Sequence, residues 1–162
     1  MAYDAFLKLD GITGESQKDQ HAGEIDVMSF SWGASNSSSV GTGTGASSGK
    51  VSISDFSIMK STDSSSPNLF QKCCDGTVIA TAVVTLQRQT NSGAAAYLVY
   101  NFTNVYVTSI QWSGSGGSGD APMESVSFCF EQGTVDYTPL DDNGAPGTAV
   151  HGGWNAGTNV KA

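Results

Sequence analysis

Three residues near the start of the chain have the side-chain types of a nucleophilic hydrolase: Ser16, His21 and Asp26. In such a site the histidine takes the proton of the serine hydroxyl, and the carboxylate orients the histidine. A catalytic serine of this kind often stands on a strained turn with glycines at fixed positions, and Ser16 has no such motif beside it. We therefore interpret the three as ordinary loop residues and predict no catalytic site.

Zinc binding is the next chemistry to consider, because histidine and cysteine are the ligands of zinc. His21, Cys73 and Cys129 are the candidates, but none of them has the spacing of a zinc-ligand pair. Cys73 and Cys74 fit better as small apolar residues on a helix face. Because the cysteines are also few and odd in number, we predict free thiols and no metal site.

Two glycine-rich segments have the letters of nucleotide-binding loops. Residues 114–119 fit G-x-G-x-x-G, but a dinucleotide site needs a helix after the loop, and a strand pattern follows here. Residues 43–50 suggest a phosphate loop, yet Thr44 replaces its first glycine and Val51 replaces the hydroxyl residue after the lysine. We predict a hairpin turn at 114–119 and no cofactor.

The three tryptophans leave one alternative function open. Trp32, Trp112 and Trp154 are the residue type of a sugar-binding platform, although buried aromatic residues with a bonded indole N–H are commoner. A non-catalytic carbohydrate-binding β-sandwich module therefore stays as the alternative.

Charge and hydropathy exclude further classes. The chain has 162 residues and a net charge of −8, and an acidic surface repels phosphate, so we expect no nucleic-acid partner. Its apolar runs are shorter than the roughly 18 residues of a membrane span, and it opens on no signal-peptide pattern. We expect the protein to assemble in the cytoplasm and not to insert into a membrane.

Alternating apolar and polar residues predict strands over most of the chain. Charged residues make up only 14%, and serine, threonine and glycine supply the polarity that suits strand surfaces and turns. The predicted strands are 5–9, 25–32, 51–59, 77–88, 97–112, 123–131 and 134–137.

One helix is predicted after Ser66, which has the residue type of an N-cap, with Pro67 at the first helical position and Gly76 after the end. Its apolar face comprises Leu69, Phe70, Cys73 and Cys74.

The strand at 25–32 has two unlike faces. Its alternation predicts a core face with Met28, Phe30 and Trp32, and an outward face with Val27, Ser29 and Ser31. Residues 35–49 are rich in glycine and serine and predict a long loop. In the glycine-rich tail, the predicted anchors are Val150 and Trp154.

Seven or more strands with one short helix predict a mainly β fold. The expected architecture is an antiparallel β-barrel or sandwich, built as a single domain over residues 1–162.

Several segments, in this order and spacing, resemble the haemolysin-coregulated proteins (Hcp), which build the inner tube of the bacterial type VI secretion system. The resemblance covers almost the whole chain. Its segments are 3–16, 24–33, Gly49-Lys50-Val51, Asp55-Phe56-Ser57 with Lys60, Ser66-Pro67-Asn68-Leu69, Val135-Asp136-Tyr137 and Gly153-Trp154-Asn155.

The resemblance implies a phage tail-tube-like fold whose subunits form hexameric rings that stack head to tail. It also implies secretion without a cleaved signal peptide, effector proteins bound and chaperoned in the lumen, spike and sheath components as partners, and no enzymatic activity. Ser29 and Ser31 are then candidate lumen and effector contacts. The candidate ring-stacking loop comprises Gly41, Thr42, Gly43, Thr44, Gly45, Ala46, Ser47, Ser48 and Gly49.

Overall fold

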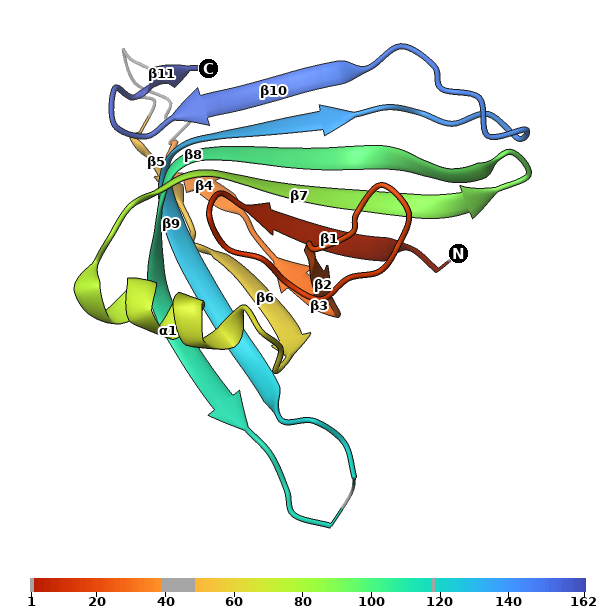
Figure 1. Ribbon diagram of the computed structural model, residues 1–162. Coiled ribbons are helices and arrows are strands. Elements are labelled where there is room, and N and C mark those ends of the chain that lie inside the picture. Colours follow the sequence, from red (N-terminus) through yellow and green to blue (C-terminus); the bar gives the residue numbers. More distant parts are fainter. Residues whose placement is uncertain (1, 39–48, 118) are drawn as a thin grey trace.

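The computed structural model describes residues 2–38, 49–117 and 119–162, and these form antiparallel strands with one helix (Figure 1). The predicted fold class, mainly β with a single short helix, is confirmed. In chain order the elements are β1 Asp4–Leu9, β2 Ile25–Val27, β3 Ser29–Ser31, β4 Ala34–Asn36, β5 Val51–Ile53, β6 Phe56–Ser61, α1 Ser66–Asp75, β7 Ile79–Thr90, β8 Gly93–Ser113, β9 Met123–Tyr137, β10 Val150–Asn155 and β11 Val160–Lys161.

Two long strands, β8 and β9, organise the sheet. Their upper parts belong to the path β11-β10-β9-β8-β7-β1-β2, and their lower parts join β6 and β3 in the order β8-β9-β6-β3. Figure 1 shows both strands bending from the upper layer into the lower one. In the part of the chain that the structure describes, the path ends at β11 and β2, so the layers form an open, sandwich-like fold.

The bend in these strands has a local cause in two residues. Asn104 on β8 has a φ of 50°, a left-handed conformation that asparagine adopts more readily than most residues. On β9, a Cβ at Gly133 would lie 2.8 Å from the Phe130 ring and 3.2 Å from the Phe102 ring. The absence of a side chain at Gly133 therefore lets β9 turn tightly over these aromatic rings.

The core fills the space between the two layers. Phe56 of β6 is fully buried, and its ring centroid lies 5.3 Å from that of Phe128 on β9 and 5.2 Å from that of Phe102 on β8. Burying a side chain of this size contributes about 1.5–3 kcal/mol to folding. Other core residues come from both layers and from the helix, and include Leu7, Ile25, Ile58, Leu69, Val84 and Val126.

Helix α1 lies against the lower part of β8 (Figure 1). Its predicted end is confirmed: Gly76 has a φ of 68° and donates its N–H to the Lys72 carbonyl. Its N-cap is Ser65 rather than Ser66, because the Ser66 hydroxyl instead accepts from the Asp63 N–H at 3.0 Å and from the Lys60 ammonium at 3.2 Å. Its apolar face is narrower than predicted, since Leu69 is buried while Phe70 is 47% exposed and Cys74 is exposed.

The predicted strand 25–32 is two strands, and the prediction for Met28 and Val27 is wrong. Met28 is 61% exposed and Val27 is buried. The reason is that β2 pairs with β1, β3 pairs with β6, and the chain bends at Met28 between the two pairings. Each strand alternates regularly, but the bend shifts the alternation by one residue. Phe30 and Trp32 do pack on the core, as predicted.

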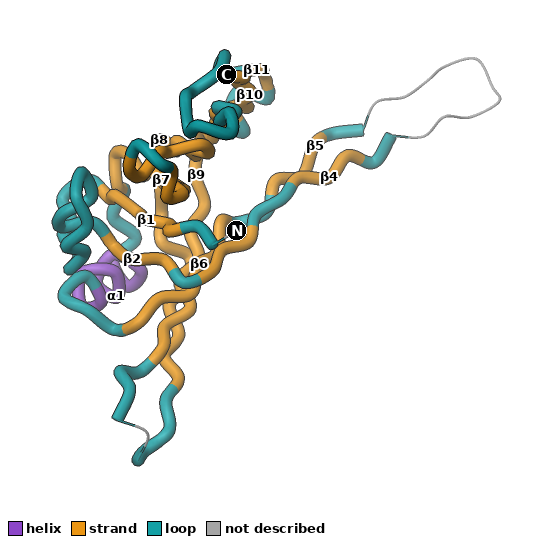
Figure 2. The backbone as a smooth tube through the Cα atoms, turned by 90° about the vertical axis from the view of Figure 1, so that its right-hand side faces the viewer, coloured by secondary structure: helices purple, strands orange, loops and turns teal. Residues whose placement is uncertain are grey.

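The segment 35–49 begins as a strand rather than as a loop. Ala34–Asn36 pairs with Val51–Ile53, and these two strands project away from the body of the protein (Figure 2). Residues 39–48 lie outside the described residues. The prediction for Val150 is also wrong, since this side chain is 65% exposed, whereas Trp154 is half-buried.

Candidate functional site

A four-stranded surface in the lower layer carries a concentration of serine side chains. Ser31 on β3 lies opposite Ser57 on β6, and Ser57 lies opposite Ser127 on β9. Residues directly opposite one another in an antiparallel pair point to the same side of the sheet. The same register adds further residues to this side, which we call the serine face: Ser29, Ser31, Ser57, Ser109, Ser125 and Ser127.

The serine face is turned away from the core. Phe56, Ile58 and Val126 alternate with these serines and are buried on the other side. The hydroxyl oxygens of Ser57 and Ser127 lie 2.8 Å apart, within hydrogen-bond distance. A shallow hollow of about 210 Å³ lies over β3, β6 and β9, and its lining includes Ser29, Ser31 and Ser125. This surface offers small, uncharged hydrogen-bonding groups and free space beside Met59, which the same register places on this side.

Both edges of the four-stranded surface lack a strand partner among the described residues. At one edge β3 pairs only with β6. At the other, the ladder between β7 and β8 ends at Ile79 and Val105, so the remainder of β8, from Tyr106 to Ser113, pairs with β9 alone. Each edge therefore presents backbone N–H and C=O groups to any strand that approaches it.

The structure places the two kinds of predicted site residue in different regions. Ser29 and Ser31 are exposed on β3, on the serine face. Of the predicted stacking loop, residues 41–48 lie outside the described residues and only Gly49 is described. A Cβ at Gly49 would lie 2.3 Å from the Ser37 hydroxyl, so glycine is required where the two sides of the projecting segment approach each other.

The hydrolase-like residues do not assemble into a triad. His21 Nδ1 lies 2.8 Å from a Glu24 carboxylate oxygen, and His21 Nε2 lies 3.1 Å from the Gln87 side-chain oxygen. The imidazole also stacks on Phe6 at 4.3 Å between ring centroids. With both ring nitrogens and one ring face occupied, His21 serves to pack the loop before β2 against β1 and β7.

The other candidate chemistry is equally unassembled. In the described ranges, no group of three or more histidine, cysteine, aspartate or glutamate side chains is placed to hold a metal ion. Cys73, Cys74 and Cys129 are free thiols, and burial followed by the charge of Asp55 raises the pKa of the Cys129 thiol. Strands β8 and β9 pair as an antiparallel hairpin on either side of the segment 114–119, in which residue 118 lies outside the described residues.

A buried ionic network that was not predicted from the sequence joins the lower layer to the helix. Lys60 and Glu124 are both fully buried, and the Lys60 ammonium donates to Glu124 at 2.5 Å. It also donates to the Asp63 carboxylate at 2.9 Å and to the Ser66 hydroxyl at 3.2 Å. The signal was available: Lys60 is in phase with Phe56 and Ile58, which are core positions.

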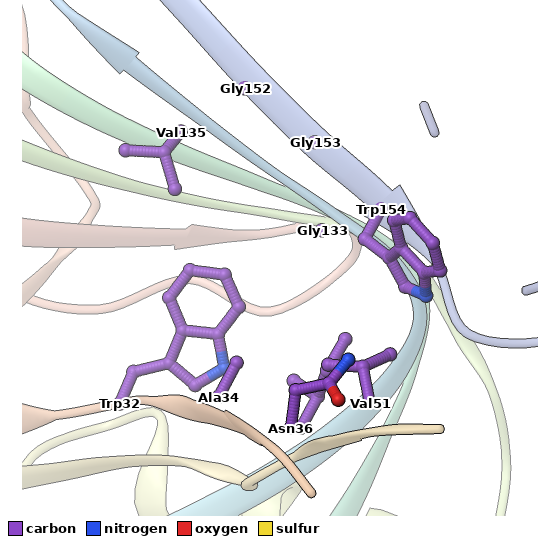
Figure 3. Close-up of a pocket in the computed structure, with 10 residues that line it drawn as sticks. Trp32, Ala34, Asn36, Val51, Gly133, Val135, Gly152, Gly153 and Trp154 are labelled. Carbon is purple, nitrogen blue, oxygen red and sulfur yellow. The ribbon is translucent and has the colours of Figure 1, made fainter. Parts of the chain in front are cut away.

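The three tryptophans do not form one platform. Trp112 donates its indole N–H to Glu124 and packs against Phe70 of α1, at 5.6 Å between ring centroids. Trp154 lies opposite Gly133 on β9, nine residues beyond Glu124, which is roughly 30 Å along a strand. Trp32 and Trp154 line a common pocket instead (Figure 3). The alternative carbohydrate platform of three indoles is therefore not formed by the residues that the structure describes.

An exposed ion pair links β10 to β9. His151 Nδ1 lies 2.6 Å from an Asp136 carboxylate oxygen, and the other Asp136 oxygen accepts from the Asn101 amide at 3.1 Å. The hydrogen bond to Asp136, followed by its negative charge, raises the pKa of His151 above its ordinary value.

Comparison with solved structures defines the class of protein first. The fold matches a solved structure described as a type six secretion system protein with a TM-score of 0.93 and 35% identity, over 99% of this chain and 100% of that one. It matches Hcp1 from Salmonella typhimurium with a TM-score of 0.81 and 33% identity, over the whole of both chains.

Sequence comparison then gives the family. The family model "Type VI secretion system effector, Hcp" matches residues 6–137. Protein hcp1 of Pseudomonas aeruginosa is 40% identical over 163 aligned positions, covering the whole of both chains. The chain belongs to the Hcp family of type VI secretion proteins, whose members act with other components of that secretion system. Within the described residues, no helix has the length and apolar character needed to cross a membrane.

Proposed function

We propose that this chain is a structural subunit of the type VI secretion inner tube. Six copies close into a ring, and the rings stack head to tail into a tube that leaves the cell. The observation that carries the proposal is the serine face on a four-stranded surface with two unpaired edges, in a chain of the Hcp family.

Ring closure accounts for the two edges. Exposed strand edges invite pairing with other chains, and natural proteins cover or block them. A head-to-tail contact joins one edge of a subunit to the other edge of the next, and repeated around a rotation axis it closes the ring. This arrangement leaves no free edge and places six copies of the same surface side by side.

The serine face supplies the lining of the lumen. Ser29 and Ser31 lie on this face, where small hydroxyls leave room and offer hydrogen bonds to varied effector proteins. None of the described residues that line the hollow on this face is charged. A cargo protein therefore forms no ion pair there and is held weakly enough to be released.

Stacking is assigned to the loop 41–49. Strands β4 and β5, which lead into and out of this segment, project from the body of the subunit (Figure 2). A projecting segment is in a position to reach the next ring along the axis.

The proposed subunit has neither an enzymatic activity nor a cofactor. Residues 1–162 act as one domain, without a metal ion, nucleic acid or membrane insertion. The subunit assembles in the cytoplasm and is secreted without a cleaved signal peptide. Its partners are further copies of itself, effector proteins, and the spike and sheath of the secretion system.

Light scattering after size exclusion tests the proposal. We expect a mass of about six times the 16.7 kDa monomer, and rings in negative-stain images. A monomer at micromolar concentration contradicts the tube assignment.

A further inference from the structure

Strand β11 forms one end of the sheet path and is only two residues long (Figure 1). It pairs with the end of β10, where Lys161 lies opposite Trp154 and Val160 lies opposite Asn155. Both of its side chains are exposed. A short strand with exposed side chains belongs to the least stable parts of a folded protein. One further contact is therefore enough to change how often β11 leaves the sheet.

The residue that follows β11 lies against the upper layer. The Ala162 N–H donates to the Gly153 carbonyl at 3.1 Å. A Cβ at Gly153 would lie 3.2 Å from the Ala162 Cβ and 2.8 Å from the methyl group of Thr134, which is buried. Gly153 and Thr134 lie opposite each other, two positions along the ladder from the pair formed by His151 and Asp136. Alternate positions of a strand point to the same side, so Ala162 lies on the side that carries His151.

His151 donates to two different elements when it is protonated. Its Nδ1 lies 2.6 Å from an Asp136 carboxylate oxygen. The hydrogen bond to Asp136 and the charge of Asp136 raise the pKa of His151, and a hydrogen bond to the Ala162 backbone raises it further. A hydrogen bond that raises the pKa favours the protonated ring, so His151 is its donor. A neutral imidazole has one N–H and donates to one of these acceptors only, whereas imidazolium donates to both.

The charges around His151 leave its own proton as the switch. Asp136 on β9 is the charged group that faces it, and the second Asp136 oxygen accepts from the uncharged Asn101 amide of β8 at 3.1 Å. On β11, Lys161 lies opposite Trp154 and therefore points to the other side of the sheet from His151.

We propose that His151 is a proton-operated latch that holds β11 on the edge of β10. The protonated ring bonds to Asp136 and to Ala162 and keeps the strand in place. When the ring loses its proton at higher pH, one of the two bonds is lost and β11 detaches more often. Detachment uncovers backbone N–H and C=O groups of β10, which then offer an edge to a strand of another chain. The latch lies within one chain, so it goes beyond the proposed ring and does not depend on it.

The titration of His151 tests the latch from one side. By linkage, a strand that docks better on the protonated ring strengthens proton binding by His151 to the same extent. Ala162→Pro removes the N–H that Gly153 accepts, and so weakens docking in the full-length chain. We expect His151 in this variant to bind its proton about two- to fivefold more weakly than in wild type, which is the size of an exposed charged contact.

NMR of the imidazole carbons in the intact protein measures this change. The chain has two histidines, so His151→Asn assigns both signals, and His21, in the loop before β2, is the internal control. Asp136→Asn removes the ion pair and shows that the titration detects the loss of a partner. If His151 has the same titration midpoint in Ala162→Pro as in wild type, the latch is overturned and His151 is a partner of Asp136 alone.

The order of β11 tests the latch from the other side, in the wild-type protein itself. We expect the methyl group of Ala162, assigned with Ala162→Gly, to be more mobile at pH 9 than at pH 5. In His151→Asn it should be mobile at both pH values. His151→Arg keeps a positive charge and several donors throughout, so Ala162 should stay ordered at pH 9. A wild-type Ala162 that is equally ordered at both pH values overturns the proposal.

Discussion

Lys60 on β6 and Glu124 on β9 lie directly opposite each other in the antiparallel ladder, and their charged groups meet inside the protein at 2.5 Å. The Lys60 ammonium also bonds to Asp63 and Ser66, at the entry to α1. One buried cation therefore holds the start of the helix to two strands of the serine-faced surface.

The first prediction concerns this pair. Lys60→Met leaves Glu124 buried without its partner, so we expect the free energy of unfolding to fall by about 3–5 kcal/mol. Urea denaturation at fixed protein concentration measures it. Lys8→Met on the exposed side of β1 is the control. The double variant Lys60→Met with Glu124→Gln should recover part of the loss. A single variant as stable as wild type contradicts the prediction.

The second prediction concerns pH. Asp136 raises the pKa of His151 in the folded protein, so the folded state binds the proton more tightly than the unfolded chain. This contribution to stability is fully present below the ordinary histidine pKa of about 6.5 and is lost as pH rises through the raised folded value. We expect the urea midpoint of wild type to exceed that of His151→Asn at pH 5, and the difference to shrink by pH 9. A constant difference across this range goes against it.

The third prediction concerns cargo. Ser31→Gln adds bulk to the serine face without touching the core, so the free energy of unfolding should change by less than about 0.5 kcal/mol. We expect an intact ring that retains less of a cognate effector in a pull-down. Ser92→Gln, in the exposed turn between β7 and β8, is the control. Equal recovery places the cargo surface elsewhere, and a broken ring places Ser31 in the subunit contact.

The fourth prediction concerns stacking. The strand pairing ends at Asn36 and Val51, and the two sides of the segment still lie close together at Ser37 and Gly49, so we replace residues 39–48 by Asn-Gly, a two-residue hairpin turn. We expect the ring mass to be unchanged, and tube length and secretion to fall. A ten-residue Gly-Ser replacement of 39–48 separates the effect of length from that of sequence. Secretion of the short variant at the wild-type level rules out the stacking role.

The fifth prediction concerns metal. No metal-binding group is assembled in the described ranges, so we expect EDTA to leave the melting temperature unchanged. A structural ion that stabilises the fold would lower it on removal. A decrease of several degrees in a thermal melt therefore identifies an ion that the fold requires.

Alternation of apolar and polar residues was enough to predict most strands and the class of fold, because a two-residue period is a local property. It failed at Met28, where the chain leaves the pairing with β1 for the pairing with β6, because Met28 is itself apolar and stays in phase with Phe30 and Trp32. It also failed at Ser35 and Asn36, whose strand pairs across a long sequence separation and carries no apolar signal.

The candidate site was only partly predictable, for a related reason. Ser29 and Ser31 were assigned to the outward face correctly because Phe30 and Trp32 mark the core side. The rest of the serine face comes from β6, β8 and β9, and depends on the register between strands far apart in sequence. The burial of Lys60 could be predicted from its phase with Phe56 and Ile58, but its partner Glu124 could not, since only the pairing of β6 with β9 identifies it.

Because β8 and β9 run without interruption through both layers, they also determine how the folded chain transmits mechanical load. A push on the lower layer travels to the upper layer along continuous backbone rather than through a flexible connection (Figure 1). Sliding one layer against the other requires many ladder hydrogen bonds to break together, which opposes shear. A protein built in this way is stiff along the two strands that span it.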